Sequence, residues 1–335
     1  MARSRKRYYN LLQPGLFDMR QDSPDETEWI EGRIIAEGGT YSDNNDDTIR
    51  IAKPVDSRLR FMSFGSGSSG NSAYLGTGQW GIIIDAGVDA AYVESQMNRN
   101  GININNVQGI LITHDHYDHV SNAYRILRNN HQIALFCTPK TLNGMLRRHG
   151  TSRRIKDYHH PIYKETAFNI RDFRITPFEV LHDGTDNVGY MIEYMHHNFI
   201  VAPDMGEIGE RAVHYLRQAT SIMIESDYDQ EMLTRGRYPE HLKSRIRSQK
   251  GHLDNIQTAL FLRESWSPSM THIFLCHLSK DNNTPQIALT TVKDELLKAG
   301  VSKVGDGSES LFSRDAPVQL YALPRFECSP LFHIL

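Results

Sequence analysis

The sequence has few cysteines and no long apolar run. Its 335 residues include three cysteines, Cys137, Cys276 and Cys328, and no two of them form a Cys-x-x-Cys pair. This odd, widely spaced set argues against a disulfide framework and against a thiolate zinc site. No apolar stretch approaches the roughly 20 residues that cross a bilayer, and no apolar signal-peptide segment follows the basic start. The sequence therefore predicts a cytoplasmic protein without a membrane partner.

An excess of charge of one sign is also absent. The formal net charge is -3, and the hydrophobic share of 39% and the charged share of 23% are ordinary for a globular protein. Such a balance provides no overall attraction to nucleic acid, so a polyanion would have to be held by a local basic patch or by metal ions. Nothing in the composition fixes an oligomeric state.

The chain divides into two parts that differ in composition and in apolar periodicity. Residues 1–57 combine a basic beginning with an acidic, Asn-rich middle and show little apolar periodicity. We predict a partly ordered extension there, in the form of a solvated tail, with a partner-docking arm as the alternative. Residues 58–335 alternate short apolar runs with amphipathic stretches and are predicted to form one main α/β domain. Asp89 and Asn255 are expected to cap the start of two of its helices.

Ten apolar runs of the main domain are predicted as strands. The earlier runs are close together and include a hairpin signal at residues 76–78, whereas the later ones alternate with helices. Two mixed sheets flanked by outer helices satisfy both patterns. The runs are RFMSF, NSAYLGT, WGIIIDA, GILITH, IALFCT, FRITPFEVLH, GYMIEYM, NFIVAPD, SIMIES and THIFLCH.

Three imidazoles and a carboxylate fall within one hexapeptide, HDHYDH, directly after the apolar run GILIT. A turn that leaves a strand can aim alternate side chains at one point, so His114 and His116 are predicted to hold one cation. Asp118 and His119 then face a second. Imidazole and carboxylate suit zinc, manganese or iron, and the lack of thiolates weakens the case for a purely structural zinc.

Four more polar residues each end an apolar run: Asp85, His182, Asp204 and His277. In open α/β sheets the functional site lies at the carboxyl ends of the strands. Each residue alone is more typical of a cap or turn, but the recurrence predicts one shared rim with the hexapeptide. Cys276 precedes His277 within a strand, so the alternation of side chains turns its sulfur away from that rim.

In chain order, Asp85, the hexapeptide, His182, Asp204 and His277 resemble the five motifs of the metallo-β-lactamase superfamily. The resemblance implies an αββα sandwich over about residues 58–322. It also implies that His114, His116 and His182 hold the first metal, that Asp118, His119 and His277 hold the second, and that Asp204 bridges both.

Within the superfamily, three stretches resemble the YycJ/WalJ-type predicted exonucleases: residues 63–75, 225–255 and 277–288. That likeness implies DNA as the partner, with digestion from the 5′ side. The chain departs from the branch at Asp227-Tyr228-Asp229, where relatives tend to have Asn-His-Asp, and at Met205-Gly206, where they have Thr-Gly. A histidine that would assist the chemistry or bind substrate is therefore absent at position 228.

Two divalent ions, zinc or manganese with iron also suitable, would lower the pKa of a bridging water and clamp the oxygens of a phosphodiester. Asp118 would both bind the second ion and orient the hydroxide or accept its proton, and Asp85 would hydrogen-bond a ligand imidazole. His252 would supply a proton to the leaving group or, alternatively, cap the next helix. Hydrolysis of a small ester, thioester or cyclic nucleotide is the second hypothesis, and a non-catalytic metal-binding scaffold is the third.

Candidate substrate contacts lie in three polar stretches. The Ser-Gly loop at 65–71 would hold a phosphate or form a mobile turn, and the basic stretch at 243–250 would follow a phosphate backbone or form a solvated helix face. An Asn pair before Thr-Pro would orient substrate or serve an ordinary turn. The individual candidates are Ser68, Ser69, Asn71, Asn282 and Asn283.

Overall fold

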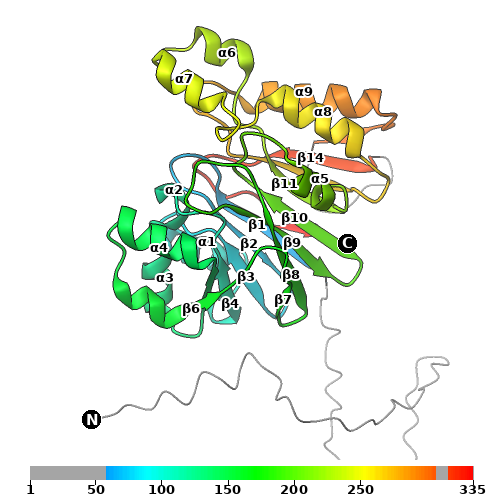
Figure 1. The fold of residues 1–335 in the computed structure, drawn as a ribbon. Coiled ribbons are helices and arrows are strands. Elements are labelled where there is room, and N and C mark those ends of the chain that lie inside the picture. The colour runs from blue at the N-terminus through cyan, green and yellow to red at the C-terminus, as the bar shows by residue number, and fades with distance from the viewer. Residues whose placement is uncertain (1–57, 307–315, 335) are drawn as a thin grey trace, which may run out of the picture. The chain divides into compact units, whose positions relative to one another are not determined.

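The computed structural model describes residues 58–306 and 316–334. The extension predicted for residues 1–57 lies outside this described part. The described residues form two β-sheets that face each other, with helices on the outer side of each sheet (Figure 1). This arrangement is the predicted αββα sandwich.

The first sheet has the strand order β15-β1-β2-β3-β4-β5-β6. It is antiparallel from β15 to β3 and parallel from β3 to β6. Its strands are β1 (Leu59–Gly65), β2 (Ser72–Gly76), β3 (Gly81–Ile84), β4 (Val107–Leu111), β5 (Ala134–Cys137), β6 (His159–Pro161) and β15 (Phe332–Ile334). The helices that follow them are α1 (Ala90–Arg99), η1 (Ile104–Asn106), α2 (Tyr117–Val120), α3 (Ala123–Asn129), α4 (Pro139–Arg148) and η2 (Arg153–Tyr158).

The second sheet has the order β13-β14-β12-β11-β10-β9-β8-β7. Its strands are β7 (Phe168–Ile170), β8 (Phe173–Glu179), β9 (Val188–Tyr194), β10 (His197–Ala202), β11 (Ser221–Glu225), β12 (His272–Cys276), β13 (Val304–Gly305) and β14 (Val318–Ala322). Its helices are α5 (Glu210–Leu216), α6 (Gln230–Arg235), α7 (Glu240–Ile246), α8 (Asn255–Ser265) and α9 (Pro285–Lys298). Helices α6 and α7 project from the top of the view in Figure 1.

The interior contains three apolar clusters, one for each contact between layers. The cluster between the sheets includes Phe61, whose ring centroid lies 4.5 Å from that of Phe274 and 5.0 Å from that of Phe199. Another cluster joins the first sheet to α1, α3 and α4, and the last joins the second sheet to α5, α8 and α9. Burial of both faces of each sheet explains why the strands read as nearly continuous apolar runs.

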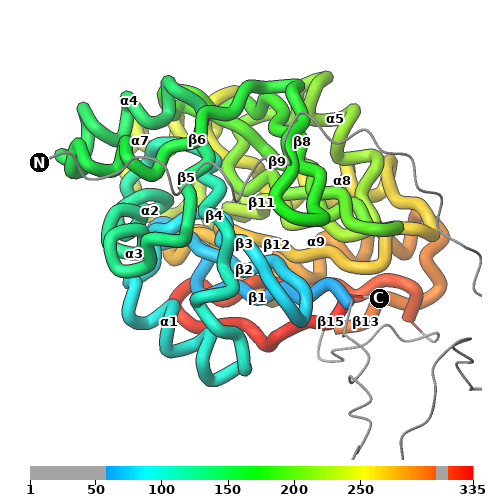
Figure 2. The backbone as a smooth tube through the Cα atoms, turned by 90° about the horizontal axis from the view of Figure 1, so that it is seen from below, coloured from blue at the N-terminus to red at the C-terminus, as the bar shows by residue number. Residues whose placement is uncertain are grey.

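All ten predicted strands are present. The missed strands β6, β7, β13, β14 and β15 have at most five residues each, and most lie at or near sheet edges, where apolar periodicity is weak. Strand β15 pairs with β1, so the first and last described strands lie side by side (Figure 2). Among the described residues, no helix combines the length and apolar composition needed to span a membrane.

One predicted helix cap is confirmed and one is wrong. The Asp89 carboxylate accepts hydrogen bonds from the backbone N–H groups of the first turn of α1, as an N-cap does. Asn255 is instead the first helical residue of α8, and the cap is Asp254. Asp254 forms a capping box with Gln257, and this reciprocal pair satisfies two backbone N–H groups where an Asn cap would satisfy one.

Candidate metal centre

The ends of five buried strands supply the polar side chains of the centre. Asp85 directly follows β3, and His277 directly follows β12. Both have left-handed backbone angles, with φ of 55° for Asp85 and 56° for His277. Such angles are uncommon for residues other than glycine and are maintained where the surroundings fix them, frequently at functional sites. The sharp turn at each strand end aims the side chain toward the hexapeptide.

Close backbone packing positions the hexapeptide. A Cβ atom at Gly87 would lie 1.5 Å from the backbone oxygen of Asp118, so no other residue fits at position 87 without displacing the turn. The Asn71 N–H donates to that same Asp118 oxygen at 2.7 Å. Residues 71 and 87 therefore fix the position of the turn that carries Asp118.

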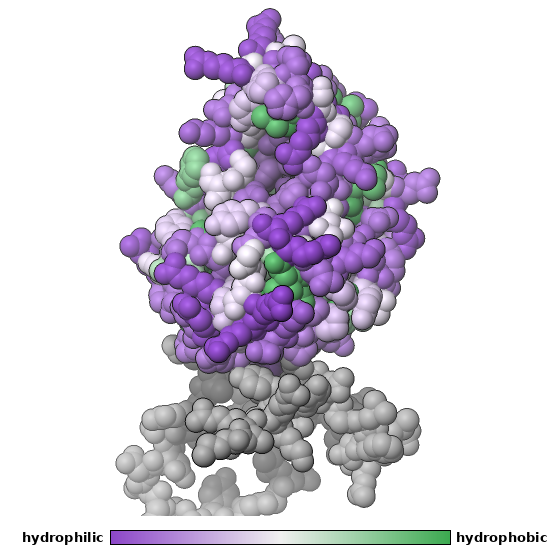
Figure 3. All heavy atoms as spheres, turned by 60° about the vertical axis from the view of Figure 1, so that its left-hand side comes forward, coloured by the Kyte–Doolittle hydropathy of each residue, from purple (hydrophilic) through white to green (hydrophobic). Residues whose placement is uncertain are grey.

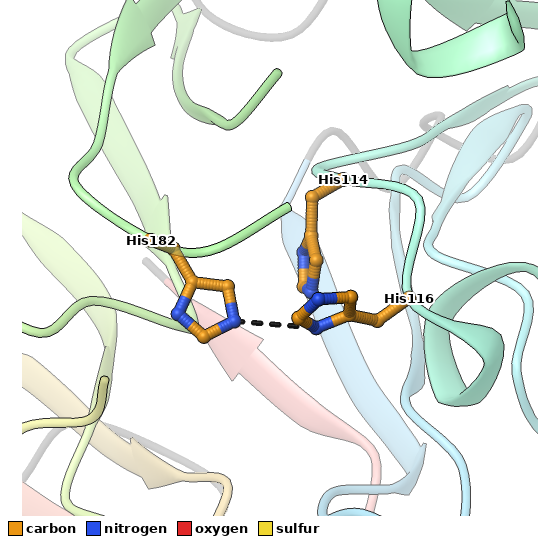
Figure 4. Close-up of side chains that lie close together, drawn as sticks. All are labelled: His114, His116 and His182. Atoms are coloured by element: carbon orange, nitrogen blue, oxygen red, sulfur yellow. Dashed lines mark hydrogen bonds between the residues drawn. The ribbon is translucent and has the colours of Figure 1, made fainter. Parts of the chain in front are cut away.

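Three histidines form the first group of candidate ligands (Figure 4). One ring nitrogen from each of His114, His116 and His182 lies within 4.8 Å of the others. The distance between His182 Nε2 and His116 Nδ1 is 3.3 Å. Ligand atoms bound at the usual Zn–N distance in a tetrahedron lie roughly 3.3 Å apart, so the spacing suits a shared cation.

The second group surrounds the carboxylates of Asp118 and Asp204. His277 Nε2 lies 3.6 Å from an oxygen of each carboxylate. His119 Nε2 lies 3.7 Å from Asp118 Oδ2 and 3.5 Å from Asp204 Oδ1. Asp204 Oδ2 is also 3.8 Å from the Nε2 atoms of His114 and His182, so Asp204 lies between the two groups.

Outward hydrogen bonds at Nδ1 orient two of the candidate imidazoles. His119 Nδ1 lies 2.8 Å from Asp85 Oδ2, and His182 Nδ1 lies 2.8 Å from the Gly251 carbonyl oxygen. An Nδ1–H that donates outward fixes the tautomer whose Nε2 lone pair faces inward, as in known metal sites. Among the described residues, the buried His114 Nε2 and His277 Nε2 have no hydrogen-bond partner. A buried nitrogen without a partner is costly, so this donor set fits a metal.

Burial and neighbouring charges move the pKa values of these groups in opposite directions. Burial lowers the pKa of His114 and of His182, which keeps these imidazoles neutral and able to bind a metal. Burial would also lower the pKa of His119, but the carboxylates of Asp204, Asp85 and Asp118 raise it well above its ordinary value. For Asp118, burial opposes ionisation but His119 and His277 outweigh it, and the pKa is lowered to about 2. The Asp118 carboxylate is therefore ionised, and the neighbouring His119 holds a proton that a bound cation would displace.

The comparisons with known proteins agree with this geometry. Residues 81–273 match the model of the β-lactamase superfamily domain. The chain belongs to the β-lactamase superfamily. This result confirms the resemblance that the five motifs indicated, and the superfamily's members include metal-binding hydrolases.

Two bacterial exodeoxyribonucleases are similar in sequence to this chain over most of their length. The exodeoxyribonuclease YycJ of Bacillus anthracis is 31% identical over 251 residues, which cover 75% of this chain and 94% of YycJ. The exodeoxyribonuclease WalJ of Streptococcus pneumoniae serotype 2 is 29% identical over 241 residues, 72% of this chain and 89% of WalJ.

Solved structures share the fold at low sequence identity. The metallo-β-lactamase fold protein YhfI of Bacillus subtilis aligns with a TM-score of 0.57 and 10% identity, covering 81% of this chain and 99% of YhfI. A diphosphatase of the PhnP family aligns with a TM-score of 0.54 and 14% identity, covering 83% of this chain and all of that protein. Both likenesses show the metallo-β-lactamase fold.

Sequence reasoning missed Glu225, which is fully buried beside the centre. Its carboxylate lies 2.6 Å from His252 Nδ1 and 3.2 Å from His277 Nδ1, and it accepts the backbone N–H groups of Met205 and Leu253. The signal was available, since Glu225 ends the apolar run SIMIE as His277 ends the run THIFLCH. Burial lowers the pKa of His252, but Glu225 and Asp227 outweigh it and raise that pKa to about 9. The ring of His252 lies 5.1 Å from that of His277.

Two further aspartates support the histidines. Asp183 Oδ1 lies 3.1 Å from His116 Nε2, which leaves His116 Nδ1 directed toward His182. Asp115, inside the hexapeptide, is fully buried and accepts from both the N–H and the hydroxyl of Thr185. Asp115 therefore ties the hexapeptide to the loop that follows His182.

The candidate substrate contacts occupy different environments. The Asn71 amide lies at the centre, with its nitrogen 3.1 Å from Asp118 Oδ2 and 2.9 Å from His119 Nε2. Ser68 and Ser69 are exposed on the adjoining loop, and Ser68 Oγ accepts from Arg325. The structure brings Asn71 to the metal donors and leaves the two serines at the surface.

The Asn pair and the basic stretch are largely engaged within the fold. The Asn283 amide donates to the carbonyls of residues 226 and 227, and Asn282 is 1% exposed, which favours the turn interpretation. Lys243 is buried, and its ammonium donates to the carbonyl of Thr234. Arg245 donates to Asp183 and Arg247 to the Thr234 hydroxyl, so three of the four cations in residues 243–250 have partners within the fold.

Tyr228, at the position where the family resemblance led us to expect a histidine, is 4% exposed. Its carbonyl accepts from the Asn255 N–H, and burial raises the pKa of its hydroxyl. A buried phenol that stays protonated cannot replace an imidazole as a base at neutral pH. The ring of His252 lies 5.0 Å from that of the candidate ligand His182.

Proposed function

We propose that this chain is a dinuclear metal-dependent hydrolase that cleaves the phosphodiester bonds of DNA from the 5′ end. The observation that carries the proposal is the convergence of buried imidazoles and carboxylates from separate strand ends on one small volume. The likeness to two exodeoxyribonucleases over about nine-tenths of their length supports DNA as the substrate.

Seven side chains would hold the two cations. Asp204 would contact both because it lies between the two groups. The ligands of the first would be His114, His116 and His182, and those of the second Asp118, His119 and His277. When bound, two divalent cations lower the pKa of water and neutralise charge on the phosphate.

Asp118 would orient the attacking water and accept its proton. Its side chain is 20% exposed, whereas that of Asp204 is 2% exposed, so Asp118 is the more accessible carboxylate from solvent. With a pKa of about 2 it is ionised at neutral pH and able to accept a hydrogen bond.

His252 would donate a proton to the leaving oxygen. With a pKa of about 9 the imidazole is protonated at neutral pH, and the contact with Glu225 places that carboxylate on Nδ1. The Nε2–H then remains for the substrate. Glu225 acts as a positioning residue, since it holds His252 and lies beside His277 at the same time.

The test is digestion of 5′-labelled single-stranded and double-stranded DNA with manganese or zinc. Wild-type protein should release labelled mononucleotides, and Asp118→Ala should abolish the release. Asp294→Ala, at an exposed aspartate of α9, is the matched control and should digest normally. Turnover of only small esters or cyclic nucleotides would replace the nuclease assignment, and absence of any turnover would favour a metal-binding scaffold.

A further inference from the structure

A strongly basic surface lies next to the hexapeptide. Residues 121–160 contain eight cations and one acid, Asp157, which gives a formal charge of 8 − 1 = +7 in a chain whose net charge is -3. All eight cations are exposed. The segment includes α3 and α4, on the side of the molecule that Figure 3 brings forward, where the surface is mostly hydrophilic; we call its exposed cations the basic face. Its cations are Arg125, Arg128, Lys140, Arg147, Arg148, Arg153, Arg154 and Lys156.

Few of these charges are neutralised within the part of the chain that the structure describes. Arg125 pairs with Asp89 at 2.9 Å, and Arg148 lies 3.6 Å from Asp115. No carboxylate of the described residues lies within 4 Å of the other six cations. A concentrated positive field without internal counterions is the electrostatic feature that attracts a polyanion.

A pocket of about 370 Å³ opens between the basic face and the hexapeptide. Two tyrosines and two arginines line it, Tyr117, Tyr124, Arg125 and Arg128, together with His149. Its volume lies within the range of roughly 300 to 1,000 Å³ that is typical of small-molecule sites.

Tyr117 connects the pocket to the metal centre. It is the fourth residue of the hexapeptide, between the predicted ligands His116 and Asp118, and it is 64% exposed. The His149 ring lies 5.6 Å from the Tyr117 ring, and its Nε2 lies 2.6 Å from the Asp115 carbonyl oxygen. A group bound against Tyr117 would therefore lie next to the turn that carries the candidate ligands His116 and Asp118.

We propose that this pocket binds one nucleotide of a single-stranded DNA segment, and that the basic face holds the phosphates next to it. A nucleobase would stack on Tyr117, since aromatic side chains bind every base through its π-face. Phosphates would contact Arg128 and the unpaired cations around it. This inference rests on the proposed function and adds the position at which the strand is held.

The test is the binding of a fluorescein-labelled single-stranded dodecamer by anisotropy. The titration uses Asp118→Ala protein equilibrated with manganese, so that the DNA is not cleaved during the measurement. In this background, Tyr117→Ala should weaken binding about 10-fold, while Tyr117→Phe, which keeps the aromatic face, should stay within about 2-fold. Tyr124→Ala provides a second pocket variant, and metal content is measured for each protein because Tyr117 adjoins ligands.

Salt dependence tests the phosphate contact separately. Arg128→Ala should lower the slope of log affinity against log salt by about 0.7, the value for one contact to a single strand. The matched control is Arg217→Ala, an exposed cation at the end of α5 in the other helix layer, which should change neither affinity nor slope.

The inference is overturned if Arg128→Ala behaves like Arg217→Ala, or if Tyr117→Ala and Tyr124→Ala bind as the background does. Binding of anionic vesicles or acidic peptide through these residues, without DNA binding, would also overturn it. If the pocket variants still digest DNA as the wild type does, the inference is refuted but the proposed function stands. If DNA binding depends on the pocket but the wild-type chain digests no DNA, the proposed function is refuted but the inferred binding site stands.

Discussion

Replacement of Asp85 by asparagine should weaken one cation site through the tautomer of His119. The Asp85 carboxylate is 2% exposed and accepts from the Thr113 N–H at 2.8 Å, from the Thr113 hydroxyl at 2.8 Å and from His119 Nδ1 at 2.8 Å. Asparagine keeps one acceptor oxygen but replaces the other with an NH₂ donor.

If the amide oxygen of the substituted side chain remains on the Thr113 N–H, its NH₂ group faces His119 Nδ1. His119 must then accept at Nδ1 and carry its proton on Nε2, the nitrogen that lies 3.5 Å from Asp204. A protonated Nε2 has no lone pair for a cation. Loss of such a supporting contact typically costs 10- to 100-fold in metal affinity, or about 1.4–2.7 kcal/mol.

The assay is zinc and manganese titration by calorimetry, with thermal unfolding as a check of the fold. We expect one of two binding events to weaken about 10- to 100-fold. Asp89→Asn is the matched control, since asparagine caps a helix as well as aspartate does, and Asp89 caps α1 at the surface. Wild-type affinity for both cations in Asp85→Asn would refute the tautomer argument.

The pKa shifts lead to three more predictions. Carboxylates raise the pKa of His119 and of His277 well above the ordinary value, so a cation must displace their protons; metal affinity should rise with pH, and calorimetry in buffers of different ionisation enthalpy should detect proton release. Glu225→Gln should lower the pKa of His252 from about 9 toward its ordinary value, so that kcat falls at a lower pH than in the wild type. If kcat of the two proteins falls at the same alkaline pH, His252 is not the proton donor. Burial lowers the pKa of His272 from 6.5 to about 4, so the unfolded state binds the proton more tightly and stability present above pH 6.5 is lost as the pH falls toward 4, by about 3 kcal/mol in total. Denaturant unfolding between pH 7 and 5 should therefore show a flatter pH dependence in His272→Leu than in the wild type, and identical slopes would exclude burial of a neutral imidazole as the cause.

The strands and the position of the site were predictable because both depend on local patterns. The run GILIT followed by HDHYDH contains a buried strand and its ligand-rich turn within eleven residues. Asp85, His182, Asp204 and His277 repeat the same strand-end pattern, and the fold brings their side chains to one rim.

Features that depend on distant pairs were not predictable in this way. Strand β15 is defined by its pairing with β1, more than 260 residues away. Its three residues are too few to show the alternation of apolar and polar side chains that predicts a strand. The role of Glu225 as a shared partner of His252 and His277 needed the geometry of two loops. The basic face is visible as an excess of charge in residues 121–160, but the pocket beside it depends on the folded arrangement.

The central claim is that seven side chains hold two cations. Anomalous diffraction from crystals grown with manganese tests it most directly. We expect two peaks, one between His114, His116 and His182 and one between Asp118, His119 and His277, with Asp204 contacting both. A single peak, or peaks bound by other residues, would contradict the account.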